Sequence, residues 1–194
     1  MFQQPRKYPH PPTNKPNMRN VIRALLAIIA IVLVVAALQP ADFRVARTTT
    51  IAAAPGVVYD QISNFQKWSA WSPWAKLDPA MKTTVSEPPA GVGATYEWSG
   101  TSKVGEGRMT ITDTKPAERV TMKLEFTKPM AATNTTEFVL KPDGAGTEIT
   151  WSMSGNNNFI GKVFGLVMNM DKMVGTKYEE GFANLKRVVE KPAP

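Results

Sequence analysis

The sequence of 194 residues has no cysteine and one histidine, His10. Without cysteine the chain cannot form a disulfide, a thiolate metal site or a cysteine nucleophile. Because His10 lies near the amino terminus, the rest of the chain also lacks the imidazole that a Ser-His-Asp triad or a histidine-built zinc or iron site needs. These absences exclude much hydrolytic and metal-dependent chemistry, and we expect no catalytic residues, no metal and no cofactor.

Acidic residues are missing from the first 41 positions, so the net charge of +7 is unevenly distributed along the chain. The basic residues of this stretch are Arg6, Lys7, Lys15, Arg19 and Arg23. The rest of the chain contains the other 18 of the 23 basic residues and all 16 acidic residues, which gives it a net charge of only +2. A nearly neutral domain without a basic stripe lacks the electrostatic footprint of phosphate binding, so we expect no nucleic-acid partner.

One long apolar run dominates the amino-terminal part of the chain. Residues 24–38 are fifteen consecutive apolar residues, and Val21 and Ile22 extend the run to eighteen positions interrupted only by Arg23. Eighteen helical residues measure roughly 27 Å, close to the thickness of the hydrocarbon core of a bilayer. Arg23 lies in the first turn, where its long side chain reaches the headgroups. The pattern predicts a single transmembrane helix over residues 21–38.

Charge asymmetry predicts the orientation of this helix. Five basic residues precede or begin the run, whereas Arg44 and Arg47 follow it, and the positive-inside rule then places the amino terminus in the cytoplasm. We expect an inner-membrane protein whose domain lies on the periplasmic side. A cleaved secretory signal is the main alternative, although residues 35–37 make a poor cleavage site, and a buried core helix is another. The proline-rich residues 1–20 are predicted to form a disordered cytoplasmic tail.

Residues 39–44 are predicted to link the helix to one α+β domain, residues 45–190, whose length suits a single core. Alternating apolar and polar residues predict strands at 43–51, 81–87, 92–99, 105–113, 119–126, 132–140 and 146–154. Between the first two strands, Pro55 opens a short helical segment. The six later strands follow one another at short spacing, which is typical of an antiparallel meander.

The carboxyl-terminal part of the domain has a helical period. Apolar residues spaced by three or four positions from Val167 to Val189 predict one long amphipathic helix. Gly175 and Gly181 lie inside it, each at a cost of about 1 kcal/mol relative to alanine. Both positions are therefore expected to benefit from a missing side chain.

Several short motifs are distributed along the whole domain. They are Ala54-Pro55, Trp71-Ser72-Pro73-Trp74, Asp78-Pro79, Gly91 with Gly93, Gly105 with Gly107, Met170-Asp171-Lys172-Met173 and Glu180-Gly181. Over about residues 43–190 they resemble the START and Bet v 1-like superfamily (SRPBCC, polyketide cyclase/dehydrase), in its bacterial membrane-anchored branch. The resemblance implies a helix-grip fold of order βααββββββα, in which a curved antiparallel sheet of about seven strands surrounds a long carboxyl-terminal helix. It also implies a ligand cavity between them.

The resemblance places the cavity along inward-facing positions but does not name the ligand, and we expect a lipid or a hydrophobic small molecule. Methionine-rich walls adapt to varied apolar ligands, and an empty cavity of about 300 Å³ would cost about 7 kcal/mol. The predicted lining residues are Trp98, Met109, Met122, Leu124, Phe126, Phe138, Trp151, Met153, Phe164, Met170, Val174 and Tyr178. The chain is thus predicted to be a membrane-tethered protein that binds an apolar or amphipathic molecule.

Two other functions stay open at this point. Acid and base chemistry in the domain would rest on carboxylates or tyrosine, and Glu97, Glu137 and Tyr96 are the candidates. Both glutamates alternate with apolar residues along their strands, which favours an outer, solvated position. A cyclase or dehydratase that uses a cavity carboxylate is therefore the alternative to a binding protein, and a noncatalytic protein-interaction module is the third hypothesis.

Residues 159–161 and 163–165 combine apolar side chains with glycines just before the predicted last helix. A linker as short as residues 39–44 would hold the domain within about 20 Å of the bilayer. We therefore predict that these two segments form a gate that opens towards lipid, with ordinary helix packing as the alternative.

Overall fold

The structure is a computed structural model that describes residues 17–190, and the chain divides after Gln39 into two compact units. The predicted tail, residues 1–20, lies mostly outside the described residues, but residues 18–20 are helical and correct that prediction. Helix α1, Met18–Leu38, begins early because the side chain of Asn17 caps it, accepting a hydrogen bond from the backbone N–H of Arg19 at 3.1 Å.

Helix α1 makes up the first unit. Its 21 residues measure about 31 Å, and its mean hydropathy reaches 3.0. Large apolar side chains along it are exposed, Leu26 by 60% and Ile31 by 61%. Among the helices of residues 17–190, α1 alone has the length and composition of a membrane span. A signal sequence near the amino terminus shares these properties.

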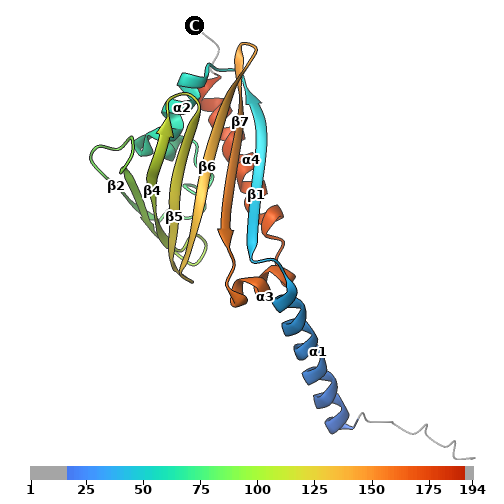
Figure 1. Ribbon diagram of the computed structural model, residues 1–194. Helices are drawn as coiled ribbons and strands as arrows, with labels where there is room; N and C mark the ends of the chain where they lie inside the picture. Colours follow the sequence, from blue (N-terminus) through green and yellow to red (C-terminus); the bar gives the residue numbers. More distant parts are fainter. Residues whose placement is uncertain (1–16, 191–194) are drawn as a thin grey trace, which may run out of the picture. The chain divides into compact units, whose positions relative to one another are not determined.

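The second unit is built on a seven-stranded antiparallel sheet in the order β1-β7-β6-β5-β4-β3-β2 (Figure 1). The strands are β1 Asp42–Ile51, β2 Lys82–Val85, β3 Thr95–Ser99, β4 Glu106–Lys115, β5 Arg119–Lys128, β6 Ala132–Asp143 and β7 Gly146–Asn156. Alternation along each strand decides which side chains face inward. In β5, for example, Val120, Met122 and Leu124 are buried while Arg119 and Lys123 are exposed.

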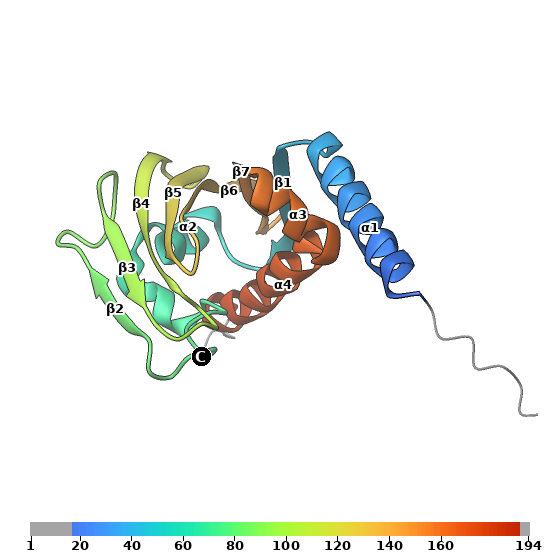
Figure 2. The same cartoon turned by 90° about the horizontal axis from the view of Figure 1, so that it is seen from below.

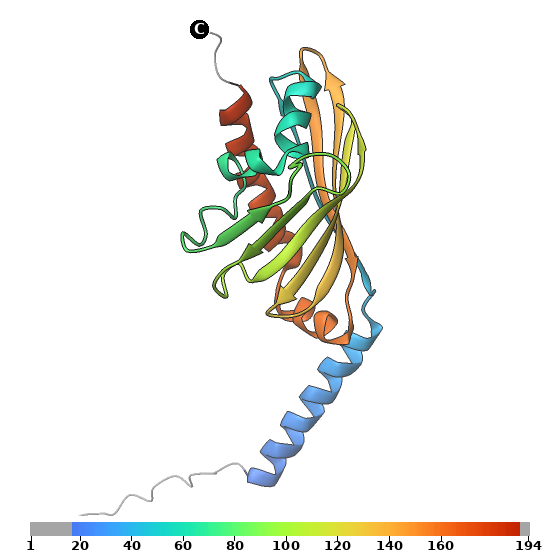
Figure 3. The same ribbon diagram turned by 90° about the vertical axis from the view of Figure 1, so that its left-hand side faces the viewer.

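Helices α2 and α4 cover the concave face of this sheet (Figures 2 and 3). The helices of the unit are α2 Pro55–Ser63, the 3-10 helix η1 Phe65–Ala70, α3 Phe159–Val167 and α4 Met170–Val189. Helix α4 packs along β1, and α2 packs against the central strands and against α4. The predicted α+β helix-grip fold is therefore confirmed.

The predicted last helix, from Val167 to Val189, starts later in the structure, at Met170, and a separate helix, α3, precedes it. Val167 ends α3, the next residue is extended, and the Asn169 side chain caps α4 by accepting a hydrogen bond from the Lys172 N–H at 2.9 Å. The apolar period continues across this break and hid it, whereas the capping asparagine marks it. The linker is also shorter than predicted, because β1 already begins at Asp42 and only residues 39–41 precede it.

An ion-pair clamp joins β1 to α4. The Arg47 guanidinium donates two hydrogen bonds of 3.0 Å to the Asp171 carboxylate and one of 2.9 Å to that of Glu179. These bonds hold the pKa of Asp171 below its ordinary value. Gly175 lies one helical turn from both acids, and a Cβ at that position would collide with the guanidinium. The prediction that Gly175 benefits from a missing side chain is therefore confirmed.

Aromatic packing holds the middle of α4. Trp151 of β7 stacks on Tyr178 with ring centroids 4.0 Å apart, and an added Cβ on Gly181 would lie 2.8 Å from Cζ3 of Trp151. The indole thus occupies the space that a side chain at Gly181 would need, which confirms the second glycine prediction. Farther along the helix, the Asn184 amide donates a hydrogen bond of 3.1 Å to the backbone carbonyl of Trp71.

Substitution of Gly181 tests this packing. Gly181→Ala is expected to lower the free energy of unfolding by about 1 kcal/mol, because overpacking costs about 1–3 kcal/mol and exceeds the gain of about 1 kcal/mol in helix propensity. The matched control is Gly56→Ala in α2, where an added Cβ meets nothing within 4 Å. The control should be neutral or slightly stabilising. Urea unfolding of the full-length variants, followed by circular dichroism, measures both, and equal effects would contradict the packing explanation.

Candidate functional site

A cavity of about 230 Å³ lies between the concave face of the sheet and α4. Its walls come from strands β3 to β7, from α4, from η1 and from the segments that follow η1, precede β2 and follow β3. The lining residues are Trp68, Ser72, Trp74, Met81, Tyr96, Trp98, Lys103, Val104, Met109, Leu124, Phe126, Thr136, Trp151, Met153, Val174 and Tyr178. Predominantly apolar walls with a few polar groups are typical of small-molecule sites, and the modest volume suits a small or slender occupant.

The cavity occupies one end of the sheet. Trp98 is next to the last residue of β3, Phe126 lies two residues before the end of β5, and Met153 lies three before the end of β7. In the antiparallel register these strand ends coincide with the start of β1, because Asp42 pairs with Asn156. The cavity therefore lies towards the end of the sheet at which the chain enters the domain.

The structure brings eight of the twelve predicted residues to this cavity, namely Trp98, Met109, Leu124, Phe126, Trp151, Met153, Val174 and Tyr178. Met122 and Phe138 do not line it, and both are fully buried in the core, each 0% exposed, although their cross-strand partners Thr136 and Trp151 do line it. Phe164 in α3 and Met170 at the start of α4 also lie elsewhere, with 51% and 42% of their surface exposed. Inward orientation alone therefore does not show which of the inward-facing residues line the cavity.

The other eight lining residues were not predicted as ligand contacts, although Tyr96 was a candidate for acid and base chemistry: Trp68, Ser72, Trp74, Met81, Tyr96, Lys103, Val104 and Thr136. Two of them had a usable signal. Tyr96 and Thr136 each lie two residues from a predicted inward-facing residue on the same strand, so strand alternation indicates them. Lys103 belongs to the loop between β3 and β4, where no period indicates which side chain faces the interior.

Apart from Lys103, the polar groups that line the cavity are few and neutral. Burial raises the pKa of the Tyr178 and Tyr96 phenols above their ordinary value, so both stay protonated at neutral pH. The indole N–H of Trp151 is buried without a hydrogen-bond partner among the described residues, whereas that of Trp68 donates to the Ile62 carbonyl at 2.9 Å. An unpaired buried donor costs about 1–3 kcal/mol. The interior thus contains a hydrogen-bond donor that the protein itself does not satisfy.

Lys103 alone is charged among the described residues that line the cavity, and its exposure marks a side on which the cavity reaches solvent. Its loop is fixed by Asp78, whose carboxylate accepts hydrogen bonds from the backbone N–H groups of Thr101 at 2.6 Å and Ala80 at 3.0 Å. The hydrogen bonds from Thr101 chiefly hold the pKa of Asp78 below its ordinary value. Asp78 therefore remains ionised, and its role is to hold the loop in place.

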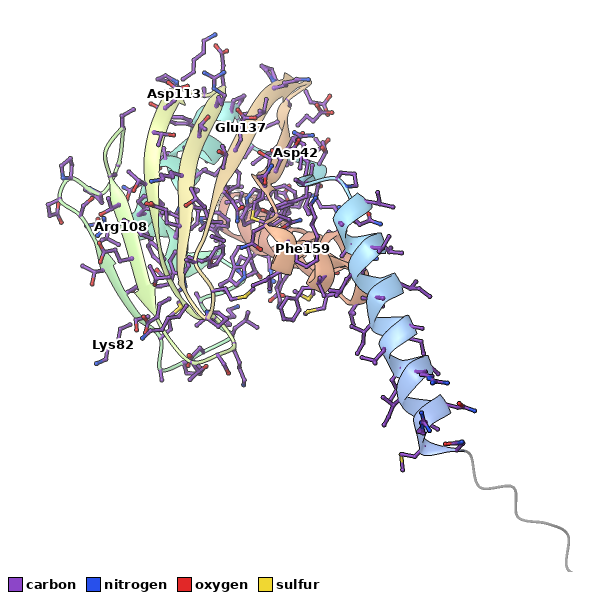
Figure 4. The ribbon with its side chains drawn as sticks, turned by 60° about the horizontal axis from the view of Figure 1, so that its bottom comes forward. Asp42, Lys82, Arg108, Asp113, Glu137 and Phe159 are labelled. Atoms are coloured by element: carbon purple, nitrogen blue, oxygen red, sulfur yellow. The ribbon has the colours of Figure 1, made fainter. Side chains whose placement is uncertain are left out.

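The carboxylates considered for acid and base chemistry lie outside the cavity. Glu97 forms an ion pair with Arg108 on the outer face of the sheet, and Glu137 alternates with buried neighbours on β6 and also faces outward (Figure 4). Of the three candidates Tyr96 lines the cavity. Within residues 17–190 no carboxylate lines the cavity, and no cluster of three or more potential metal ligands is found.

Comparison with solved structures shows the same fold in several proteins. Protein CV1439 from Chromobacterium violaceum has a TM-score of 0.57 and 17% identity, covering 79% of this chain and 100% of that chain. Protein MLL2253 from Mesorhizobium loti has a TM-score of 0.59 and 13% identity, covering 78% and 100%. The Aha1 dimer from Colwellia psychrerythraea has a TM-score of 0.55 and 18% identity, covering 76% and 96%. Identities this low show the fold alone.

A search of curated proteins gave no match. The family comparison, in contrast, covers almost the entire second unit: residues 42–190 match the family described as polyketide cyclase/dehydrase and lipid transport. The match agrees with the curved sheet, the long final helix and the cavity between them. The chain therefore belongs to the polyketide cyclase/dehydrase and lipid transport family.

Proposed function

We propose that the protein is a membrane-tethered binding protein for an apolar or amphipathic small molecule or lipid. The observation that carries this proposal is the cavity of about 230 Å³, whose walls are formed mainly by aromatic, methionine and aliphatic side chains. Apolar walls of this kind bind a ligand by removing its surface from water, which contributes about 25 cal/mol per Å². Membership of a family that includes lipid transport supports the same ligand class.

The energetics of the cavity favour an occupant. An empty cavity of about 230 Å³ would cost about 5.5 kcal/mol at roughly 24 cal/mol per Å³. This figure is an upper bound because the cavity reaches solvent beside Lys103. It is comparable with the free energy of unfolding of a typical domain, about 5–15 kcal/mol. A ligand that fills the space would recover much of this loss.

The polar groups of the wall indicate an amphipathic ligand. An apolar body would lie against Leu124, Phe126 and Met153, while a polar or anionic head would lie beside the exposed Lys103. The Trp151 N–H, which has no hydrogen-bond partner among the described residues, is a further donor in the proposed site. A long-chain carboxylic acid has this combination of an apolar tail and an anionic head.

Helix α1 is the membrane anchor in this proposal. Its 21 residues suit a hydrocarbon core of about 30 Å, and the basic residues that precede it favour a cytoplasmic amino terminus. Only residues 39–41 separate Leu38 from Asp42, so the two Cα atoms are at most about 14 Å apart. The domain is thereby confined near the periplasmic surface of the inner membrane, where ligands dissolved in the bilayer are concentrated.

The two alternative functions have less support from the site. A cyclase or dehydratase acting through a cavity carboxylate lacks that group among the described lining residues, which offer Tyr96, Tyr178 and Lys103 as titratable groups. An interaction module with a vestigial interior would be expected to have a collapsed core, whereas here the sheet and α4 enclose open space.

Filling the cavity tests the binding function. Leu124→Trp is expected to weaken binding of a dansyl-labelled fatty acid at least about tenfold, equivalent to about 1.4 kcal/mol, because the larger side chain occupies ligand space. Lys123→Trp is the matched control, since it places the same side chain on the outer face of β5. Energy transfer from tryptophan to dansyl is measured on full-length protein in nanodiscs, with each variant compared in unfolding midpoint. Unchanged affinity in a folded Leu124→Trp protein would reject this cavity as the site.

Replacing Lys103 tests the proposed polarity of the ligand. Lys103→Met should weaken binding of a fatty acid about tenfold, the value of one charge-assisted interaction, and leave binding of the fatty alcohol of equal chain length unchanged. Competition against the dansyl probe measures both affinities. An equal loss for the acid and the alcohol would show that Lys103 does not recognise an anionic head.

A further inference from the structure

Helix α3 presents bulky apolar side chains to its surroundings, and none of its residues is buried. Phe159, Ile160 and Phe164 are 48%, 55% and 51% exposed, and Val167 is 85% exposed. The exposed surface continues through Met168, Met170 and Met173 into the first turn of α4. We call these seven residues the α3 patch. Contiguous exposed apolar surface of this kind marks an interaction site on a soluble domain.

The position of the α3 patch in the fold identifies its partner. Asp42, the first residue of β1, pairs with Asn156, the last residue of β7, and α3 begins three residues later at Phe159 (Figure 4). The patch is therefore at the end of the sheet where the chain arrives from Leu38. The opposite end of the sheet carries the hairpin turns 115–119 and 143–146. Apolar surface and membrane attachment thus share one end of the domain.

The charges around the patch suit an anionic lipid surface. Lys162 in α3 and Lys172 in α4 form no ion pair among the described residues. The one acidic residue within residues 157–174 is Asp171, and its carboxylate is bound by the Arg47 guanidinium at 3.0 Å. An apolar helix with lysines at its margin is typical of segments that lie in the interface of a bilayer containing anionic lipids.

We propose that α3 and the first turn of α4 form a second membrane contact, in which the α3 patch lies in the headgroup and upper acyl region of the bilayer. This proposal rests on the anchoring role given to α1. The anchor confines the domain within one short linker of the membrane, so docking of the patch has little translational entropy left to lose. A docked patch also brings the cavity end of the sheet to the lipid surface, so a ligand would pass between cavity and bilayer without crossing water. Ordinary packing of α3 into the core, the alternative to a gate, is not observed, because α3 has no buried residue.

Site-specific fluorescence tests the proposal, and the absence of native cysteine makes single labelling straightforward. Phe164→Cys in the full-length protein is labelled with the environment-sensitive fluorophore NBD and reconstituted in vesicles of phosphatidylcholine and phosphatidylglycerol. The matched control is Val57→Cys, an equally exposed apolar position, 48%, on α2. We expect a blue-shifted emission at position 164, loss of that emission when nitroxide-labelled lipids are added, and neither effect at position 57.

The outcomes separate this proposal from the anchoring of α1. If alkaline carbonate extracts the protein from the membrane, the anchoring role of α1 is rejected, and the second membrane contact that rests on it is rejected as well. A protein that resists carbonate but shows water-like emission at position 164 would keep the anchor and overturn the docking proposal alone. A blue shift without quenching by nitroxide lipids, together with short distances between spin labels at position 164 of different molecules, would show that a second copy of the chain covers the patch and would also overturn it.

Discussion

Helix α4 is held across the concave face of the sheet by two sets of contacts, and the cavity lies beside it. Near its start, Arg47 of β1 binds acids on the helix and lies directly over Gly175; farther along, Trp151 lies against Gly181. On the same helix, Val174 and Tyr178 line the cavity. Larger residues at either glycine would push the helix away from the sheet, so the two glycines determine how closely helix and sheet approach and how much space remains.

Much of the fold follows from residue periods that act over many positions. The alternation of Val120, Met122 and Leu124 with polar residues specified β5 and its inward face without knowledge of the partner strands. Helical spacing specified α4 equally well but ran unbroken through the boundary with α3, because the break depends on one residue, Asn169. A helix boundary of this kind depends on a single capping residue, whereas a periodic pattern is supported by many residues. Helix boundaries are therefore harder to predict from sequence than the helices themselves.

The site was less predictable than the fold for a related reason. Strand alternation tells which side chains face inward. Met122 and Leu124 have the same orientation, but only Leu124 lines the cavity, because the helices that cover the sheet decide which inward-facing residues border open space. Lys103 lies in a loop whose path is fixed by Asp78 accepting backbone hydrogen bonds, an interaction across more than twenty residues. Such tertiary contacts leave no local pattern.

The proposed function joins these features at one end of the domain: the cavity, the exposed helix α3 and the short connection to α1. Its central claim is that the cavity holds an apolar or amphipathic molecule. Native mass spectrometry of the full-length protein released from nanodiscs tests this claim most directly. We expect a bound molecule in stoichiometric amount, either co-purified or acquired on addition of a long-chain acid. A protein that shows only its bare mass in both conditions would contradict it.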